Sequence, residues 1–167
     1  MMEEGDIRLG RIRRVDGGFE GRLERHIGHD RNTVWRKLTD ASALPEWLAP
    51  GSIELRNGGA VRIDFADSGT TIDSTVLELD APRLLVYSWS SGNEPARPLR
   101  WELETMPEGT RLVLTVGVPE GEDPAKACAG FDAHLEMLLA ALEGVSIGFP
   151  FKLYVAARKG YQEQLGQ

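Results

Sequence analysis

The residues of this chain best suited to metal or acid–base chemistry include two closely spaced histidines. His26 and His29 are followed directly by Asp30, which gives a His-x-x-His-Asp spacing. A zinc site needs three or four ligands of this kind, and only the distant His134 could complete the set. We interpret the segment as a solvated strand end followed by a helix N-cap at Asp30. We therefore predict no metal site and no cofactor.

His134 lies in a segment with helical periodicity, about 60° around the helix from Phe131. An imidazole at that edge of an apolar stripe could act as a general base or hydrogen-bond a ligand. The favoured alternative is a packed histidine whose ring nitrogens are satisfied by neighbouring protein groups. Cys128 begins the same stripe, and we interpret it as a small buried hydrophobe rather than a nucleophile.

Large aromatic residues recur on the apolar phase of neighbouring predicted strands. Aromatic side chains with polar atoms commonly line ligand pockets, although they also fill cores. Tyr87 and His134 are the best candidates for fixing the orientation of a ligand. The predicted lining of the pocket is Trp47, Phe65, Tyr87, Trp89, Trp101, Phe131, His134 and Leu138.

Carboxylates do not suggest a catalytic pair. Asp64, Asp73, Glu78, Glu102 and Glu104 mostly occupy the polar phase of the predicted strands and should face water. A paired-carboxylate mechanism therefore lacks support, and we predict no catalytic residue.

Hydrophobic periodicity predicts the elements that position these residues. A hairpin is expected over about 6–27 with its turn at Asp16-Gly17, followed by short helices over 31–38 and 43–48. From 52 to 118 the period is two, and tight turns join successive strands, so we predict an antiparallel meander. A slip of phase near Val76-Leu77 predicts a β-bulge.

A long helix is predicted over about 124–143 as the cover for the apolar face of this sheet. Its stripe consists of Phe131, Leu135, Leu138 and Leu142, and we expect Asp132, Glu136 and Glu143 to point away. The segment 145–167 should dock as a short terminal helix. The predicted fold class is α+β, a helix-grip fold in which a curved antiparallel sheet surrounds a long C-terminal helix, in a single domain over 1–167.

Composition limits the partners and the compartment. The 167 residues carry a formal net charge of −7, which opposes nucleic acid as a partner. No stretch approaches the roughly 18 apolar residues of a membrane span, and the charged start of the chain lacks the apolar core of a signal peptide. A single cysteine indicates a reducing compartment, so we predict a cytoplasmic protein.

Five segments of this chain follow one another in an order that is known from a protein family. They are RHIGHDRNTVWRKLTDASALPEWLAP, LRNGGAVRIDF, LDAPRLLVYSW, LRWELETMPEGTRLVLT and GFDAHLEMLLAAL. In this order they resemble the START-like (SRPBCC) superfamily, in the branch named for the activator of the heat shock protein 90 ATPase. The resemblance covers about 15–165, with Gly130-Phe131 where the family usually has Gly-Trp. It implies a pocket between the sheet and the long helix.

The leading functional hypothesis is a noncatalytic domain that binds a small hydrophobic molecule. The resemblance further implies a chaperone-accessory or stress-related role, with a chaperone as a partner. One alternative is an enzyme of the polyketide cyclase or aromatase type that uses the same cavity, with His134 or Tyr87 as acid or base. Another is a protein-interaction module, monomeric or homodimeric, that acts through Phe149-Pro150-Phe151 and the terminal helix.

Overall fold

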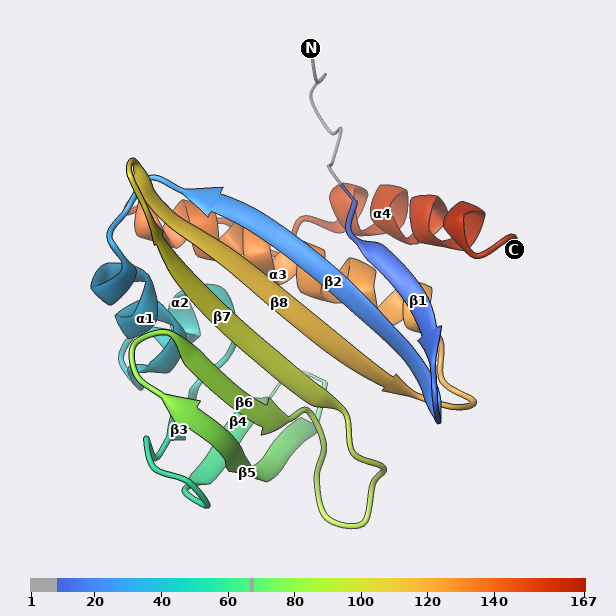
Figure 1. The fold of residues 1–167 in the computed structure, drawn as a ribbon, viewed down its shortest axis with the longest axis horizontal. Helices are drawn as coiled ribbons and strands as arrows, with labels where there is room; N and C mark the ends of the chain where they lie inside the picture. Colours follow the sequence, from blue (N-terminus) through green and yellow to red (C-terminus); the bar gives the residue numbers. More distant parts are fainter. Residues whose placement is uncertain (1–8, 67) are drawn as a thin grey trace.

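The computed structural model of this protein describes residues 9–66 and 68–167, and it shows a curved antiparallel sheet around a long helix (Figure 1). The sheet has the strand order β1-β2-β8-β7-β6-β5-β4-β3. The strands are β1 (Arg11–Val15), β2 (Gly18–Ile27), β3 (Gly51–Ile53), β4 (Ala60–Phe65), β5 (Thr70–Asp80), β6 (Leu84–Ser88), β7 (Pro98–Met106) and β8 (Gly109–Pro119). The helices are α1 (Arg31–Thr39), α2 (Leu44–Trp47), α3 (Pro124–Leu142) and α4 (Phe151–Gln164). The predicted α+β helix-grip fold is confirmed.

The pairing of the strands follows from their turns. Val15 pairs with Gly18, so Asp16-Gly17 forms a two-residue turn, in which Gly17 takes a positive φ that glycine adopts without strain. The predicted hairpin reaches back to residue 6, and its first residues lie outside the described part of the chain. The bulge predicted near Val76-Leu77 is confirmed as a register shift between Val76 and Glu78. β2 pairs along its whole length with β8, so the last strand returns to the first hairpin.

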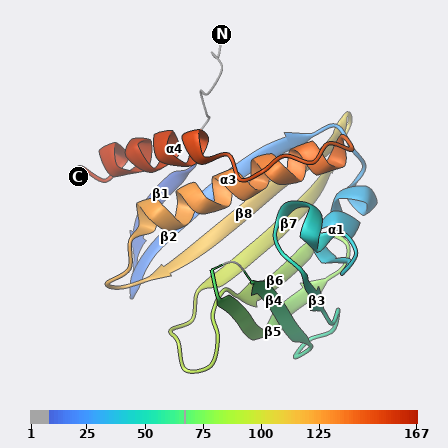
Figure 2. The same cartoon turned by 180° about the vertical axis from the view of Figure 1, so that it is seen from behind.

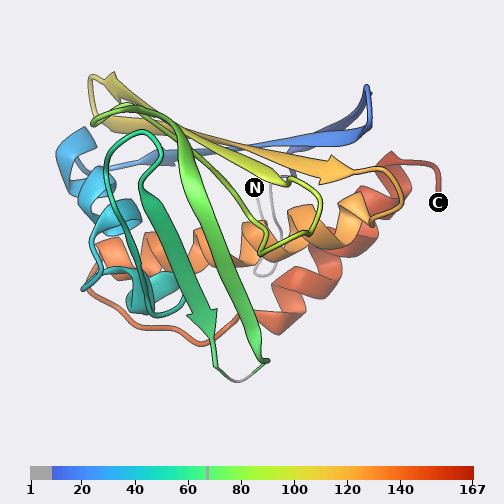
Figure 3. The same ribbon diagram turned by 90° about the horizontal axis from the view of Figure 1, so that it is seen from below.

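Helix α3 covers the concave face of the sheet, as Figures 2 and 3 show from two sides. The inward residues of the central strands are fully buried, among them Leu23, Leu99 and Leu114. Leu135 and Leu138 of α3 pack against this face. Each such side chain stabilises the fold by about 1.5–3 kcal/mol through removal from water. Helices α1 and α2 lie at one end of the sheet (Figure 3).

The start of α1 is capped as predicted. The Asp30 carboxylate accepts a hydrogen bond from the backbone N–H of Thr33 at 2.7 Å, which satisfies one of the free donors of the first turn. The indole Nε1 of Trp47 donates to the carbonyl of Lys37 at 2.7 Å and so joins α2 to α1. Among the described residues, no helix is long and apolar enough to cross a membrane.

The expectation that Asp132 points away from the core is wrong. Asp132 is completely buried because α4 packs on the side of α3 that faces away from the cavity-forming strands (Figure 2). Its Oδ1 accepts from Nη2 of Arg25 at 3.0 Å, and its Oδ2 accepts from the hydroxyl of Tyr161. Arg25 also bonds Glu136, Nε to Oε2, at 3.1 Å. Glu143 is exposed, as expected.

This buried cluster joins three elements, β2, α3 and α4. The hydroxyl of Tyr161 also accepts from the backbone N–H of Gly10 at 2.9 Å. One turn later, the side chain of Gln164 accepts from the N–H of Ile12 at 2.7 Å and donates to the carbonyl of Gly10 at 3.0 Å. Helix α4 therefore holds both α3 and the edge of the sheet at β1.

Replacing Tyr161 by Phe should destabilise the protein by about 1–3 kcal/mol at neutral pH, because it leaves a buried carboxylate oxygen without a donor. Burial raises the pKa of Asp132, whereas Arg25 and the Tyr161 hydroxyl act against this rise. Loss of the hydroxyl raises that pKa further, so the destabilisation should shrink as the pH falls through the pKa of Asp132. Denaturant unfolding at pH 7 and pH 4 measures both effects.

Tyr154→Phe is the matched control, since Tyr154 lies on the same helix but packs against Phe149 and Phe151. It should change the free energy of unfolding by less than about 0.5 kcal/mol at either pH. An equal loss for the two variants, or a loss for Tyr161→Phe that does not depend on pH, would contradict the role given to the buried carboxylate.

Candidate functional site

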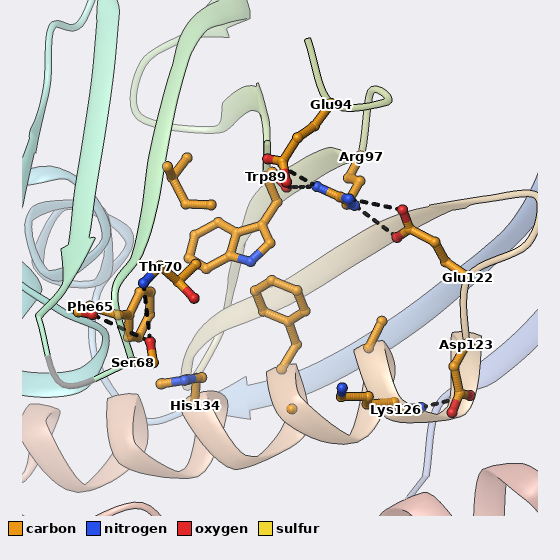
Figure 4. A pocket seen from close by; sticks show the side chains of 14 residues that line it. Phe65, Ser68, Thr70, Trp89, Glu94, Arg97, Glu122, Asp123, Lys126 and His134 are labelled. Carbon is orange, nitrogen blue, oxygen red and sulfur yellow. Dashed lines mark hydrogen bonds and ion pairs between the residues drawn. The ribbon is translucent and has the colours of Figure 1, made fainter. Parts of the chain in front are cut away.

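A cavity of about 610 Å³ opens between the end of the β4–β5 hairpin, the β6–β7 loop and the first half of α3 (Figure 4). This volume lies in the range of pockets that hold drug-sized molecules. The lining residues are Phe65, Ser68, Thr70, Ile72, Trp89, Glu94, Arg97, Glu122, Asp123, Lys126, Ala127, Gly130, Phe131 and His134.

Aromatic rings in edge-to-face contact form one wall of the cavity. Trp89 is central, with its ring centroid 5.3 Å from Phe131 and 5.9 Å from Phe65. Phe65 in turn lies 6.0 Å from the ring of His134. These spacings are typical of favourable aromatic pairs, which hold their rings in fixed orientations. The wall therefore offers flat apolar surface to an occupant.

His134 is the imidazole at one end of this wall. Its Nδ1 lies 2.9 Å from the carbonyl oxygen of Trp47, which can only accept, so Nδ1 carries the proton in this bond. Burial lowers the pKa of His134, although the bond to the Trp47 carbonyl acts against the shift, so the ring is neutral at pH 7. Its Nε2 then carries a lone pair, and no group within 9–66 or 68–167 bonds it. His134 can accept a proton or a hydrogen bond from an occupant.

Arg97 lies at the end of the cavity opposite His134 and links the residues there. Its guanidinium forms a two-pronged ion pair with Glu122, with both N···O distances at 2.8 Å, and lies 3.6 Å from Glu94 (Figure 4). The backbone of Arg97 accepts from the N–H of Trp89 at 2.7 Å, and its side chain donates to the Trp89 carbonyl at 3.2 Å. Arg97 thus holds Trp89 in place and ties the β6–β7 loop to the start of α3.

Four of the eight sequence-predicted pocket residues line this cavity, namely Phe65, Trp89, Phe131 and His134. The structure places the other four, Trp47, Tyr87, Trp101 and Leu138, in the core behind it. The ring of Trp47 packs against Trp101 at 5.7 Å, and Trp47 reaches the site through its carbonyl. Burial raises the pKa of Tyr87, so its phenol stays protonated.

Sequence reasoning missed the polar residues of the cavity, in particular Ser68, Arg97, Glu122 and Lys126. Ser68, Arg97 and Glu122 lie in loops and next to strand ends, where no periodicity indicates the direction of a side chain, and Lys126 lies in the first turn of α3, away from its apolar stripe. The signal that could have found them is the position of Trp89, an aromatic residue at the edge of a Gly- and Pro-rich loop.

The other residues singled out for chemistry lie elsewhere. His26 bonds Glu24 at 3.1 Å on the outer face of the sheet, and His29 bonds Glu143 at 2.9 Å. Cys128 is fully buried, and burial raises the pKa of its thiol to about 12, so it is no nucleophile. In the part of the chain that the structure describes, no group of three His, Cys, Asp or Glu side chains could hold a metal ion.

Known families and structures agree with this architecture. The family described as Activator of Hsp90 ATPase homolog 1-like protein matches residues 29–143, which include the whole lining of the cavity. No curated protein matches the sequence.

Solved structures extend the likeness over nearly the whole chain. CalU16 from Micromonospora echinospora has a TM-score of 0.75 at 18% identity, covering 96% of this chain and 98% of that one. EF2215 from Enterococcus faecalis has a TM-score of 0.78 at 23% identity, covering 94% and 90%. These two likenesses concern the fold. DynU16, a protein in the dynemicin biosynthetic locus, has a TM-score of 0.68 at 26% identity, covering 74% of this chain and 47% of that one.

Replacing Arg97 by Gln should loosen the cavity wall with little effect on stability. The ion pair with Glu122 is partly exposed, so its loss should cost less than about 1 kcal/mol. Of the four tryptophans in the sequence, all of which the structure describes, Trp89 is the one that is partly exposed, whereas the other three are buried. Acrylamide quenching of tryptophan fluorescence therefore reports mainly on Trp89 and should increase in Arg97→Gln.

Arg83→Gln serves as the control, because Arg83 pairs with Asp80 at 2.6 Å in a turn that does not line the cavity. It should leave the quenching unchanged. If Arg97→Gln also left it unchanged, Arg97 would not be the residue that holds Trp89.

Proposed function

Because this chain belongs to the family of Activator of Hsp90 ATPase homolog 1-like proteins, we propose that it binds a small, largely aromatic molecule in the cavity beside α3. Binding would remove the flat apolar faces of the molecule from water, at about 25 cal/mol for each Å² buried. The neutral imidazole of His134 would accept a hydrogen bond from a hydroxyl group and so fix the orientation of the molecule.

One observation carries this proposal. The edge-to-face wall of Phe65, Trp89 and Phe131 lies next to a histidine whose proton is fixed on Nδ1 by a backbone carbonyl. A preformed apolar wall beside an oriented acceptor favours a flat ligand with a hydroxyl donor over a flexible chain. The likeness to DynU16, a protein in the dynemicin biosynthetic locus, supports a small-molecule role.

Gly130 allows a test that removes no contact. It lies on α3 in the lining, and a Cβ built there meets open space. Gly130→Leu should fill the cavity and abolish binding without loss of stability, whereas Gly130→Ala should preserve binding and stabilise α3 by up to about 1 kcal/mol. The probe is naringenin, a hydroxylated flavonoid, and the readout is the unfolding temperature with and without it.

At 100 times its dissociation constant, naringenin should stabilise the wild type by about 2.7 kcal/mol. For a domain of this size that is a rise of roughly 5–10 °C in the unfolding temperature. The same rise in Gly130→Leu would place the binding elsewhere. No rise in the wild type with naringenin or with other hydroxylated aromatic molecules would sink the proposal.

A second candidate function is acid–base catalysis on such a molecule, as in a polyketide cyclase or aromatase. The fixed tautomer of His134 favours it, because an unbonded Nε2 at a cavity wall can act as a general base. His134→Asn keeps a donor near the position of Nδ1 and removes Nε2, whereas His134→Gln places an amide near Nε2. An enzyme should lose turnover in both variants, and a binding protein should keep its affinity within about tenfold in His134→Gln.

A chaperone-accessory or stress-related role in the cytoplasm stays a prediction from the name of the family. An interaction through the tail is also open to test, because Phe149, Phe151 and Val155 are exposed. Analytical ultracentrifugation of the wild type and of Phe151→Ser separates a monomer from a homodimer formed by these residues.

A further inference from the structure

The outer face of the sheet carries a second hollow, distinct from the aromatic cavity and about 390 Å³ in volume. It lies where β1 begins, against β2 and β8. Its lining consists of Leu9, Gly10, Arg11, Arg22, Glu24, His26 and Arg111. Three arginines line the hollow against the carboxylate of Glu24, and Glu104 lies 3.7 Å from Arg111, so positive charge stays in excess here on a protein whose formal net charge is −7.

The positions of two of these arginines call for a negatively charged partner. Arg11 and Arg22 are directly opposite each other in the β1–β2 register, so they share one face of the sheet. Like charges in this arrangement repel and destabilise a strand pair. Within residues 9–66 and 68–167, no carboxylate forms an ion pair with either guanidinium.

An ion pair between Arg111 and Glu24 makes the side of the hollow next to β8 rigid. The guanidinium of Arg111 bonds both carboxylate oxygens of Glu24 at 3.0 Å, and this pair lowers the pKa of Glu24. The start of β1 is equally fixed, because Gly10 is bonded to Tyr161 and Gln164. A Cβ at Gly10 would lie 2.2 Å from the carbonyl oxygen of Arg22, so the strands approach closely here. The cationic side chains thus surround a site with a formed floor.

We propose that this hollow binds the phosphate group of a small molecule, with Arg11 and Arg22 as its principal ligands. Guanidinium groups donate in pairs to tetrahedral oxyanions. A phosphate monoester carries a charge of about −1.5 to −2 at pH 7, which matches the excess of positive charge. The net negative charge of the protein disfavours an extended anionic surface and favours a small ligand that fits the hollow.

The test is a titration of the full chain with inorganic phosphate at low ionic strength, followed by ¹H–¹⁵N NMR. Amides of residues 9–11 and 22–26 should shift saturably. Arg22→Gln should weaken binding at least about tenfold, because it removes one of two charge-assisted donors. Arg13→Gln is the matched control, since Arg13 lies on the same face of β1, pairs with Glu20 and does not line the hollow. It should change the affinity less than about twofold.

Three outcomes would overturn the proposal. The first is the absence of saturable shifts in the wild type, or equal effects of Arg22→Gln and Arg13→Gln. The second is that phosphate binds the triple variant Glu3→Gln/Glu4→Gln/Asp6→Asn but not the wild type. That result would mean that the chain's own carboxylates, and not a phosphate, are the anions that the hollow binds. The third is Arg22-dependent sedimentation with phosphatidylserine vesicles without binding of free phosphate, which would assign the hollow to a membrane surface.

Discussion

A buried carboxylate fixes the rotation of the central helix, and the candidate site depends on that rotation. Asp132 has no access to water, so its charge requires both the Arg25 guanidinium from β2 and the Tyr161 hydroxyl from α4. Gly130 and His134 are two positions away on either side, about 200° around the helix. Turning α3 enough to withdraw them from the cavity would leave an unpaired charge in the core. The cost of that charge keeps the cavity face in place.

A chain of hydrogen bonds fixes the orientation of the His134 imidazole in the candidate site. The backbone carbonyl of Lys37 in α1 accepts a hydrogen bond from the Trp47 indole, and the backbone carbonyl of Trp47 accepts one from Nδ1 of His134. Trp47 therefore acts twice without its ring touching the cavity. The two short helices at the end of the sheet thus determine which nitrogen of His134 is protonated, and with it whether the cavity offers a donor or an acceptor.

Periodicity was sufficient to predict the strands, the bulge and α3, because each of these buries one face and repeats its apolar residues accordingly. It was insufficient for Asp132. Periodicity reveals the single apolar stripe of α3 that packs on the sheet, but the docking of α4 buries a second side of this helix, and that side includes the carboxylate of Asp132. The aromatic residues were found for the same reason as the core, and periodicity could not separate Trp89, at the wall, from Trp101, behind it. Arg97 carries no periodic signal at all.

The residues matched by the family include the whole lining of the cavity, but not the residues that hold α3 in position. All lining residues fall within 29–143, whereas Arg25, Tyr161 and Gln164 lie outside that range. Those three residues join β1, β2 and α4 into one unit behind α3. Without it, Asp132 would face water and the back of α3 would be exposed. The first hairpin and the last helix therefore support the candidate site, because they set the position of a helix whose other side lines the cavity.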